Sequence, residues 1–287
     1  MLIFQAIVLG LVQGLTEFIP ISSSAHLIIV PWLFGWNDPV LTSLTFDVAL
    51  HAGTLIAVLW YFWADWIKVI RAFFASLFER KIGGDPDRLL AWLLVVGTIP
   101  GAIAGVLGES KIEALFHQPG VPIKPIAMII MGVIIAALAA LLLLAEVLAK
   151  HEREMSQLTW RDSILIGLAQ AFAIFPGVSR SGSTITAGLG LGLKRETAAR
   201  FSFLLSAPII AGAVAKSSLD VVKAFQTGAF AQSELILFPI GVIVAGVSGY
   251  FAIRFLLRYL QTNSTLAFVW YRFGLAALVI AVALIRG

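Results

Sequence analysis

The chain has 287 residues, of which 60% are hydrophobic and 13% charged, against roughly 45–50% and 25% in a soluble domain. This composition excludes an ordinary soluble protein and indicates an integral membrane protein. The sequence has no cysteine, which excludes disulfides, thiolate catalysis and cysteine metal sites. The formal net charge of +4 comes from short loops between apolar runs, so the positive-inside bias explains it better than a nucleic-acid partner does.

Six apolar runs approach the length of about 20 residues that a helix needs to cross a bilayer. We therefore predict an all-α polytopic membrane protein, because a helix satisfies its own backbone hydrogen bonds where water is absent. The runs are Leu44–Trp63, Leu89–Leu107, Ile126–Leu148, Phe201–Leu219, Leu235–Leu257 and Leu266–Ile285.

Two stretches break this pattern. The first apolar segment, Leu2–Phe34, reads QGLTEFIPISSSAH in its middle. We expect two short helices there that meet at a turn inside the membrane and leave on the same side, since irregular backbone at that depth must be buried or line a wet cavity. The second stretch, Phe175–Thr186, reads FPGVSRSGSTIT and contains Arg180. An arginine near the bilayer centre costs about 2.5–3.5 kcal/mol, so it needs a compensating role such as pairing with an anion.

The two polar stretches are related by an internal repeat. At a constant offset of 157 (167 − 10), the coinciding pairs are Gly10/Gly167, Leu11/Leu168, Gln13/Gln170, Phe18/Phe175, Ser22/Ser179 and Ser24/Ser181. We predict a single integral membrane domain, 1–287, with two repeats, 1–150 and 156–287, each a re-entrant helix pair followed by three transmembrane helices. Three crossings change sides and a re-entrant pair does not, so the second repeat must be inverted and the two polar turns should converge near the midplane.

The basic residues predict the orientation of the chain. Loops 65–88, 149–162 and 254–263 together carry ten lysines and arginines, whereas the segments on the other side carry five. These opposite segments are 31–45, 109–125, 216–234 and the C-terminus. The first side is therefore predicted to be cytoplasmic, with both termini outside.

The first polar turn holds candidate catalytic groups. Gln13 and Glu17 share a helix face, and a carboxylate in apolar surroundings calls for a cation or a metal ion. The alternative is a protonated glutamate that caps a structural turn. Ser22, Ser23 and His26 place hydroxyl nucleophiles beside an imidazole, which is the minimum for covalent transfer. Each serine is equally suited to hydrogen-bonding the turn.

The second polar turn is a candidate phosphate site. The guanidinium of Arg180 and the hydroxyls of Ser179, Ser181 and Thr184 suit a phosphate better than a carboxylate. The start of the following helix would also face an anion. The alternative is an arginine that pairs with Glu17 only to hold the two turns together.

Other polar groups rank lower. Arg272 enters the last span and could reach the site or extend toward the membrane surface. His51 and Asp47 are predicted to form a structural pair, and Glu146 is predicted to pair with Lys150 near a loop. The glycines of GLGLGLK are predicted to serve close helix packing rather than nucleotide binding.

Two motifs carry a family resemblance over essentially the whole chain. QGLTE at Gln13–Glu17, leading into SSSAH, and PGVSRSGST at Pro176–Thr184 resemble the signatures of the undecaprenyl-diphosphate phosphatases, also called the bacitracin-resistance family. The resemblance implies removal of the terminal phosphate from undecaprenyl diphosphate, which yields the monophosphate carrier used in cell-wall synthesis. It also implies a divalent cation, Mg²⁺ or Ca²⁺, and a site open toward the outer face of the bacterial cytoplasmic membrane.

The resemblance also assigns roles to residues of this sequence. Those it implies for catalysis are Glu17, Ser22, Ser23, His26 and Arg180. Those it implies for substrate binding are Gln13, Ser179, Ser181, Thr184 and Arg272, which stands in a Tyr-Arg-Phe context. Glu17 and Gln13 would organise the metal, although Gln13 stands where many members have glutamate, and Ala25 stands where a glycine is common.

The expected partners are the polyprenyl diphosphate lipid and the membrane, with no nucleic acid and with a homodimer as one assembly to test. We expect the polyprenyl tail to stay in lipid beside the glycine-rich helices. Inverted repeats with broken helices are also a transporter architecture, so a transporter or flippase of the polyprenyl phosphate carrier is the alternative function. The other large family of membrane lipid phosphatases fits poorly, because its upstream Lys…Arg-Pro element is missing.

Overall fold

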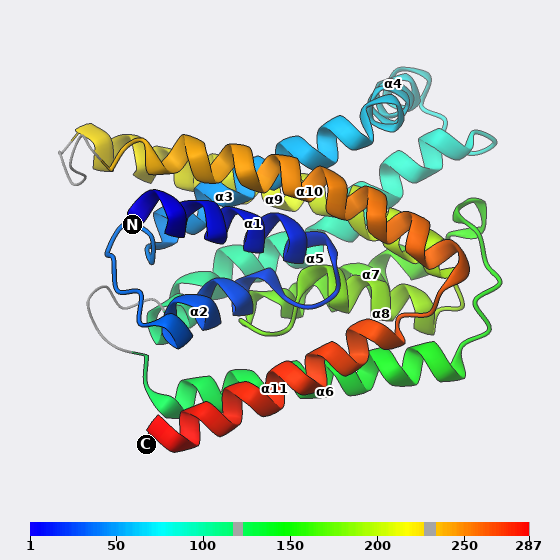
Figure 1. The fold of residues 1–287 in the computed structure, drawn as a ribbon. Helices are drawn as coiled ribbons and strands as arrows, with labels where there is room; N and C mark the ends of the chain where they lie inside the picture. Colours follow the sequence, from blue (N-terminus) through cyan, green and yellow to red (C-terminus); the bar gives the residue numbers. More distant parts are fainter. Residues whose placement is uncertain (117–122, 227–233, 287) are drawn as a thin grey trace.

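The computed structural model describes residues 1–116, 123–226 and 234–286, and all the regular elements in these ranges are helices (Figure 1). Two 3₁₀ turns, η1 (Met155–Gln157) and η2 (Phe172–Ile174), accompany them. The helices are α1 (Leu2–Phe18), α2 (Ser23–Phe34), α3 (Leu44–Tyr61), α4 (Trp63–Glu79), α5 (Pro86–Phe116), α6 (Pro125–Leu148), α7 (Trp160–Ala171), α8 (Arg180–Gly190), α9 (Arg195–Gln226), α10 (Leu237–Thr262) and α11 (Leu266–Arg286).

Six of the described helices are long and apolar enough to span a membrane, which confirms the predicted runs. They are α3, α5 over Pro86–Gly108, α6, α9 over Arg195–Lys216, α10 and α11. The chain is therefore a multi-pass membrane protein of all-α class.

Three predicted loops contain helix in their described residues. Loop 65–88 contains most of α4, because its charges lie on one side of an amphipathic helix rather than in a coil. Segments 109–125 and 216–234 continue α5 and α9 as far as Phe116 and Gln226. The rest of these two segments includes residues 117–122 and 227–233, which lie outside the described ranges.

Two pairs of short helices interrupt the bundle. The second helices of the pairs, α2 and α8, have 12 and 11 residues. At a rise of 1.5 Å per residue, each is roughly 18 Å long and falls short of the about 30 Å hydrocarbon core. In Figure 1, α1 begins at the end of the bundle that carries both termini and α7 begins at the opposite end, and both turns lie midway along the bundle. This arrangement is compatible with the inverted repeat predicted from the sequence.

The two turns share a local geometry. Ser22 is the N-cap of α2 and Ser179 the N-cap of α8, and their φ angles are 78° and 69°. Each hydroxyl accepts a hydrogen bond from the amide three residues later, at 3.4 Å from Ala25 and 3.0 Å from Gly182. A positive φ at a residue other than glycine costs of order 1–3 kcal/mol and persists only where the surroundings impose it.

Packing between the two halves fixes the position of both turns. Helix α1 packs along α10 and α7 packs along α5, so each re-entrant pair leans on a helix of the other half. A Cβ atom at Gly14 of α1 would lie 2.5 Å from the carbonyl oxygen of Ala245 on α10. Only glycine allows this approach. Beside it, Phe18 meets Phe203 of α9 edge to face, with ring centroids 5.3 Å apart.

Candidate active site

Glu17 is the point at which the two polar turns meet. Its Oε1 accepts a hydrogen bond from Nη2 of Arg180 at 2.9 Å, across 163 residues of sequence. Its Oε2 accepts from Nε2 of Gln13 at 3.0 Å and from Oγ of Ser23 at 2.6 Å. The side chain of Glu17 is only 4% exposed. The prediction that the two turns converge is thus confirmed, because one carboxylate receives donors from both.

Two buried polar atoms at this junction have no hydrogen-bond partner among the described residues: Nη1 of Arg180 and Oε1 of Gln13. An unpaired buried polar group costs about 1–3 kcal/mol, more if charged, so such groups call for an explanation. Beside the Glu17 carboxylate, one donor of Arg180 and one acceptor of Gln13 therefore lack a partner in the described part of the chain. A ligand with anionic oxygens would satisfy the guanidinium, and a cation or water would satisfy the amide oxygen.

The three serines of the first turn differ in what they contact. Ser23 donates to the Glu17 carboxylate, as above. Ser22 is fully buried, caps α2 and lies 3.3 Å from Oγ of Ser24. Ser22 therefore belongs to the turn itself, whereas Ser23 carries a hydroxyl whose proton already points at a carboxylate.

His26 has both ring nitrogens occupied. Nδ1 lies 2.6 Å from the carbonyl oxygen of Ser22, which can only accept, so Nδ1 carries a proton. In the neutral ring Nε2 then accepts from the hydroxyl of Tyr271 at 2.7 Å, and the two rings are stacked. His26 ties the strained turn to α11. The sequence pattern indicated Arg272 as a candidate in this segment but gave no role to its neighbour Tyr271.

Arg272 is 1% exposed and reaches the backbone of both turns. It donates from Nη1 to the carbonyl of Pro20 at 3.1 Å and from Nη2 to that of Gly177 at 2.9 Å. Further bonds run to the carbonyls of Val178 and Ile135. Of the two interpretations left open from the sequence, extension to the membrane surface is wrong, because the guanidinium lies inside the bundle.

The hydroxyls of the second turn are engaged within the protein. Ser181 donates to the carbonyl of Ile19 at 3.3 Å and so links the two turns directly. Thr184 lies 2.8 Å from the carbonyl of Arg180 and 2.6 Å from Oγ of Ser202 on α9. Ser179 caps α8. The structure brings Ser179, Ser181 and Thr184 to the site as supports of the loop that presents Arg180.

His51 also reaches the site. Its Nδ1 lies 2.7 Å from the carbonyl of Asp47, and its Nε2 lies 3.5 Å from Oε2 of Glu17. The predicted structural pair with Asp47 therefore accounts for Nδ1 of His51, whereas Nε2 lies beside Glu17. The imidazole is 28% exposed, more than the carboxylate beside it. A signal that could have found it is a further match between the repeats at an offset of 155, in which the neighbours Leu50 and Ala52 coincide with Leu205 and Ala207.

Glu146 does not pair with Lys150 as predicted. Its carboxylate accepts from Arg195 at the start of α9, at 2.8 Å from Nε, and from the amide and hydroxyl of Thr265 before α11. The physical reason is the side on which Glu146 projects: it is 7% exposed and faces the bundle interior. This cluster ties three helices together away from the polar turns.

A metal ion would have few protein ligands here. Among the described residues no group of three or more His, Asp or Glu side chains could hold an ion. Glu17 and the unpartnered Oε1 of Gln13 offer oxygen ligands, which Mg²⁺ and Ca²⁺ prefer. Mg²⁺ is commonly bound by one or two carboxylates together with substrate phosphates and water. The site fits a cation shared with a phosphate ligand rather than a closed protein cage.

Comparison with known proteins places the chain in a family. A family model described as bacitracin resistance protein BacA matches residues 6–278, which include both polar turns. The chain is 46% identical over 280 residues to an undecaprenyl-diphosphatase of Thermomicrobium roseum, with 98% of each chain covered. It is 46% identical over 286 residues to an undecaprenyl-diphosphatase of Moorella thermoacetica, with 100% of each chain covered. The chain belongs to the bacitracin resistance protein BacA family.

Proposed function

We propose that this protein is an undecaprenyl-diphosphatase, which hydrolyses undecaprenyl diphosphate to undecaprenyl phosphate and inorganic phosphate and so returns the lipid carrier to cell-wall synthesis. The observation that carries the proposal is the junction of Glu17, Ser23 and Arg180, inside a chain whose full-length relatives bear that name. A carboxylate, a hydroxyl and a guanidinium with one open donor are the groups that phosphoryl transfer requires.

Substrate binding follows from the open donor. Nη1 of Arg180 is the group that would bind an oxygen of the terminal phosphate, while Nη2 stays on Glu17. Arg180 is also the first residue of α8 and Ser23 the first residue of α2. Both helices therefore direct their N-terminal ends at the site, and such ends carry about half a positive charge each. These fields favour a diphosphate over a neutral headgroup.

The chemical step begins at Ser23. Its Oγ attacks the terminal phosphorus while its proton passes to Oε2 of Glu17, which it already contacts at 2.6 Å. The bond from that phosphorus to the bridging oxygen breaks, and its electron pair leaves with undecaprenyl phosphate. Water then attacks the phosphoserine, the Glu17 carboxyl returns its proton to Oγ of Ser23, and orthophosphate leaves with both protons of the water, which restores the Ser23 hydroxyl and the Glu17 carboxylate. Arg180 stabilises the charge on the transferred group, the contribution that usually dominates in such reactions.

Other predicted residues take supporting roles in this scheme. Ser22 and His26 hold the first turn, because their polar atoms are engaged with the turn and with Tyr271. Arg272 fixes the backbone of both turns and adds positive charge close to the diphosphate. Direct attack by a water molecule that donates its proton to Glu17 is the variant of the scheme that needs no phosphoserine.

A divalent cation, Mg²⁺ or Ca²⁺, belongs to the proposal. It would neutralise part of the diphosphate charge when bound. Glu17 through its carboxylate and Gln13 through Oε1 would hold it, and the unpartnered state of that amide oxygen supports the assignment. Removal of divalent ions with a chelator is expected to reduce turnover, and restoration by Mg²⁺ or Ca²⁺ identifies the ion.

We place the protein in the bacterial cytoplasmic membrane with the site open to the outer face. The basic residues of segments 65–88, 149–162 and 254–263 support the orientation, because the positive-inside bias favours the cytoplasm for them, and both termini lie together at one end of the bundle (Figure 1). Labelling of single introduced cysteines at the two ends, with a membrane-impermeant reagent, tests the orientation. The homodimer stays a prediction, to be tested by light scattering of the detergent-solubilised protein.

The function is tested by orthophosphate release from undecaprenyl diphosphate with the purified protein in detergent micelles. A phosphatase releases phosphate without two compartments, whereas a flippase of the phosphate carrier does not. Steady release by the wild-type chain and its loss in Ser23→Ala support the phosphatase. Absence of release from the folded wild-type protein, with and without divalent ions, would contradict it.

A further inference from the structure

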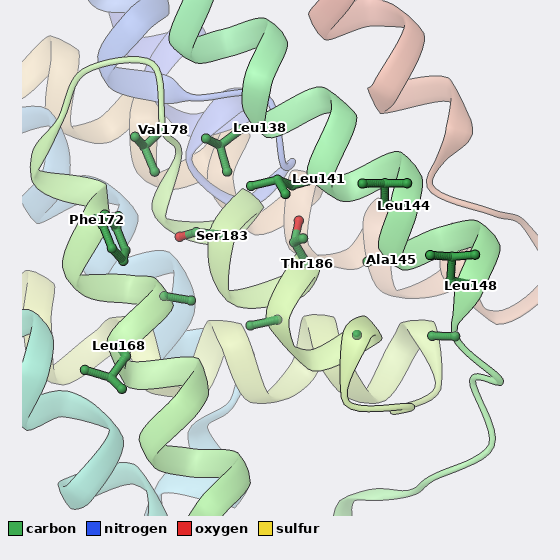
Figure 2. A pocket seen from close by; sticks show the side chains of 14 residues that line it. Leu138, Leu141, Leu144, Ala145, Leu148, Leu168, Phe172, Val178, Ser183 and Thr186 are labelled. Carbon is green, nitrogen blue, oxygen red and sulfur yellow. The ribbon is translucent and has the colours of Figure 1, made fainter.

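An apolar groove runs beside the second polar turn, between α6, α7 and α8 (Figure 2). Its volume is about 720 Å³, within the range of roughly 300–1,000 Å³ that is typical of small-molecule sites. No lining side chain carries a charge. The walls are formed mainly by Leu138, Leu141 and Leu144 of α6 and by Leu168 and Phe172 on the α7 side.

One end of the groove adjoins the candidate active site. Val178 and Ser183 line this end, and they stand two residues before and three residues after Arg180. The Ser183 hydroxyl is tied to the carbonyl of Arg180 at 3.1 Å, which connects the wall of the groove to the residue that faces the phosphate. The groove continues along α8 to Gly190, about 15 Å from Arg180 at the helical rise.

The chemistry of the groove restricts its occupant. Two leucines of its α6 wall are about half exposed, with 50% for Leu141 and 52% for Leu144, so in a membrane they need an apolar cover. Ser183 and Thr186 are the polar side chains in the lining, and the Ser183 hydroxyl is already bonded. An apolar chain whose charged end lies at Arg180 fits both parts of this surface.

We propose that the groove binds the polyprenyl chain of the substrate next to its diphosphate, and that it makes the enzyme selective for long prenyl chains. The proposal rests on the proposed function, because it takes the diphosphate to lie at Arg180. It sharpens the expectation that the tail stays in bulk lipid beside the glycine-rich helices. Gly190 lines the far end of the groove.

The groove can be blocked at Gly190 without a clash. A Cβ atom there would meet nothing within 4 Å, so Gly190→Trp fills space in the groove rather than displacing the backbone. Gly212 on α9 is equally open and does not line the groove. Gly212→Trp is therefore the matched control for adding a large aromatic side chain to a helix of this protein.

The assay compares two substrates in each variant: undecaprenyl diphosphate, with eleven isoprene units, and geranyl diphosphate, whose two units are too short to reach Gly190. In Gly190→Trp we expect the KM for the long substrate to rise at least about tenfold, since losing even small apolar contacts in a pocket costs this much. The KM for geranyl diphosphate and both kcat values should stay as in the wild type. Gly212→Trp should match the wild type with both substrates.

Thr186 provides an independent readout. Its hydroxyl is buried without a hydrogen-bond partner among the described residues. Thr186→Val removes this hydroxyl with little change of shape, so an apolar occupant should bind as well or better. A raised KM for the long substrate in Thr186→Val would indicate a polar occupant and would overturn the proposal.

Two further results would overturn it. Unchanged kinetics of Gly190→Trp with the long substrate would assign the groove to bulk lipid, and an equal loss with both substrates would indicate a distorted active site. Photo-crosslinking of a diazirine-labelled polyprenyl diphosphate to the wild-type protein gives a test that needs no variant. We expect labelled peptides from α6 and α8, and labelling confined to other helices would contradict the proposal. If the wild type releases no phosphate from either substrate, the proposed function fails, and the crosslinking still reports on the groove.

Discussion

Removal of the Arg180 guanidinium distinguishes a catalytic arginine from one that pairs with Glu17 only to hold the two turns together. Arg180→Met keeps the length of the apolar stem and removes the guanidinium, so the Glu17 carboxylate loses its 2.9 Å partner. That carboxylate is 4% exposed. Breaking a buried ion pair by removing one partner costs about 3–5 kcal/mol of stability. Arg180→Met should therefore unfold at a clearly lower temperature than the wild type in the same detergent.

The activity of this variant should fall further than its stability explains. Loss of one donor that stabilises a transition state lowers kcat by about 10²–10³-fold, and Nη1 of Arg180 is the open donor at the site. Orthophosphate release from undecaprenyl diphosphate, measured below the unfolding temperature of the variant, gives this value. Arg180→Lys should recover part of the stability and little of the activity, because a lysine cannot bond Glu17 and a phosphate with one planar group.

The double variant Arg180→Met with Glu17→Gln decides between the two interpretations. The neutral amide no longer needs a cationic partner, so the double variant should regain most of the lost stability. It should remain inactive, since both the proton acceptor and the phosphate donor are gone. Recovery of activity together with stability, or near-normal activity of Arg180→Met alone, would refute the catalytic role and leave a structural pair.

Substitutions at three other positions test the surroundings of the site. His51→Leu should lower kcat about tenfold, as loss of a group that orients a ligand carboxylate does, while His51→Gln keeps a polar side chain beside Glu17 and should retain more activity; equal effects would contradict the orienting role. Tyr271→Phe removes the donor to His26 and should cost about 1–3 kcal/mol of stability, measured by thermal unfolding, and an unchanged unfolding temperature would argue against this bond. Glu146→Gln weakens the cluster with Arg195 and Thr265 and should lower the unfolding temperature without changing KM for the substrate. A changed KM in Glu146→Gln would show that the distant end of the bundle affects the site.

The spans and the broken helices could be predicted from the sequence because each has a local cause. Apolar runs of crossing length fix where helices span, and the polar turns reveal themselves by placing Glu17 and Arg180 at membrane depth. The convergence of the turns followed from the repeat, and the bond between Glu17 and Arg180 confirms it. Both turns also start their second helix from a capping serine with a positive φ, at positions that coincide in the repeat.

The contacts that the sequence did not reveal depend on how helices rotate and pack. His51 reaches Glu17 because α3 turns that face of the helix inward, and Tyr271 reaches His26 across 245 residues through the packing of α11. Glu146 has a lysine four residues away but projects into the bundle toward α9 and α11 instead. The charged residues of 65–88 predict a loop, whereas the apolar face of α4 makes most of this segment a helix. In each case the deciding information is the direction of a side chain, which spacing along one helix does not determine.

In the proposed reaction, Ser23 of the first turn attacks a phosphate that Arg180 of the second turn holds. The most direct measurement is mass spectrometry of the protein after acid quenching during turnover of undecaprenyl diphosphate, a treatment that phosphoserine survives. We expect a phosphorylated peptide with the modification on Ser23, absent in Ser23→Ala, which should also release no orthophosphate. Phosphate on Ser22, or continued turnover by Ser23→Ala, would contradict the claim.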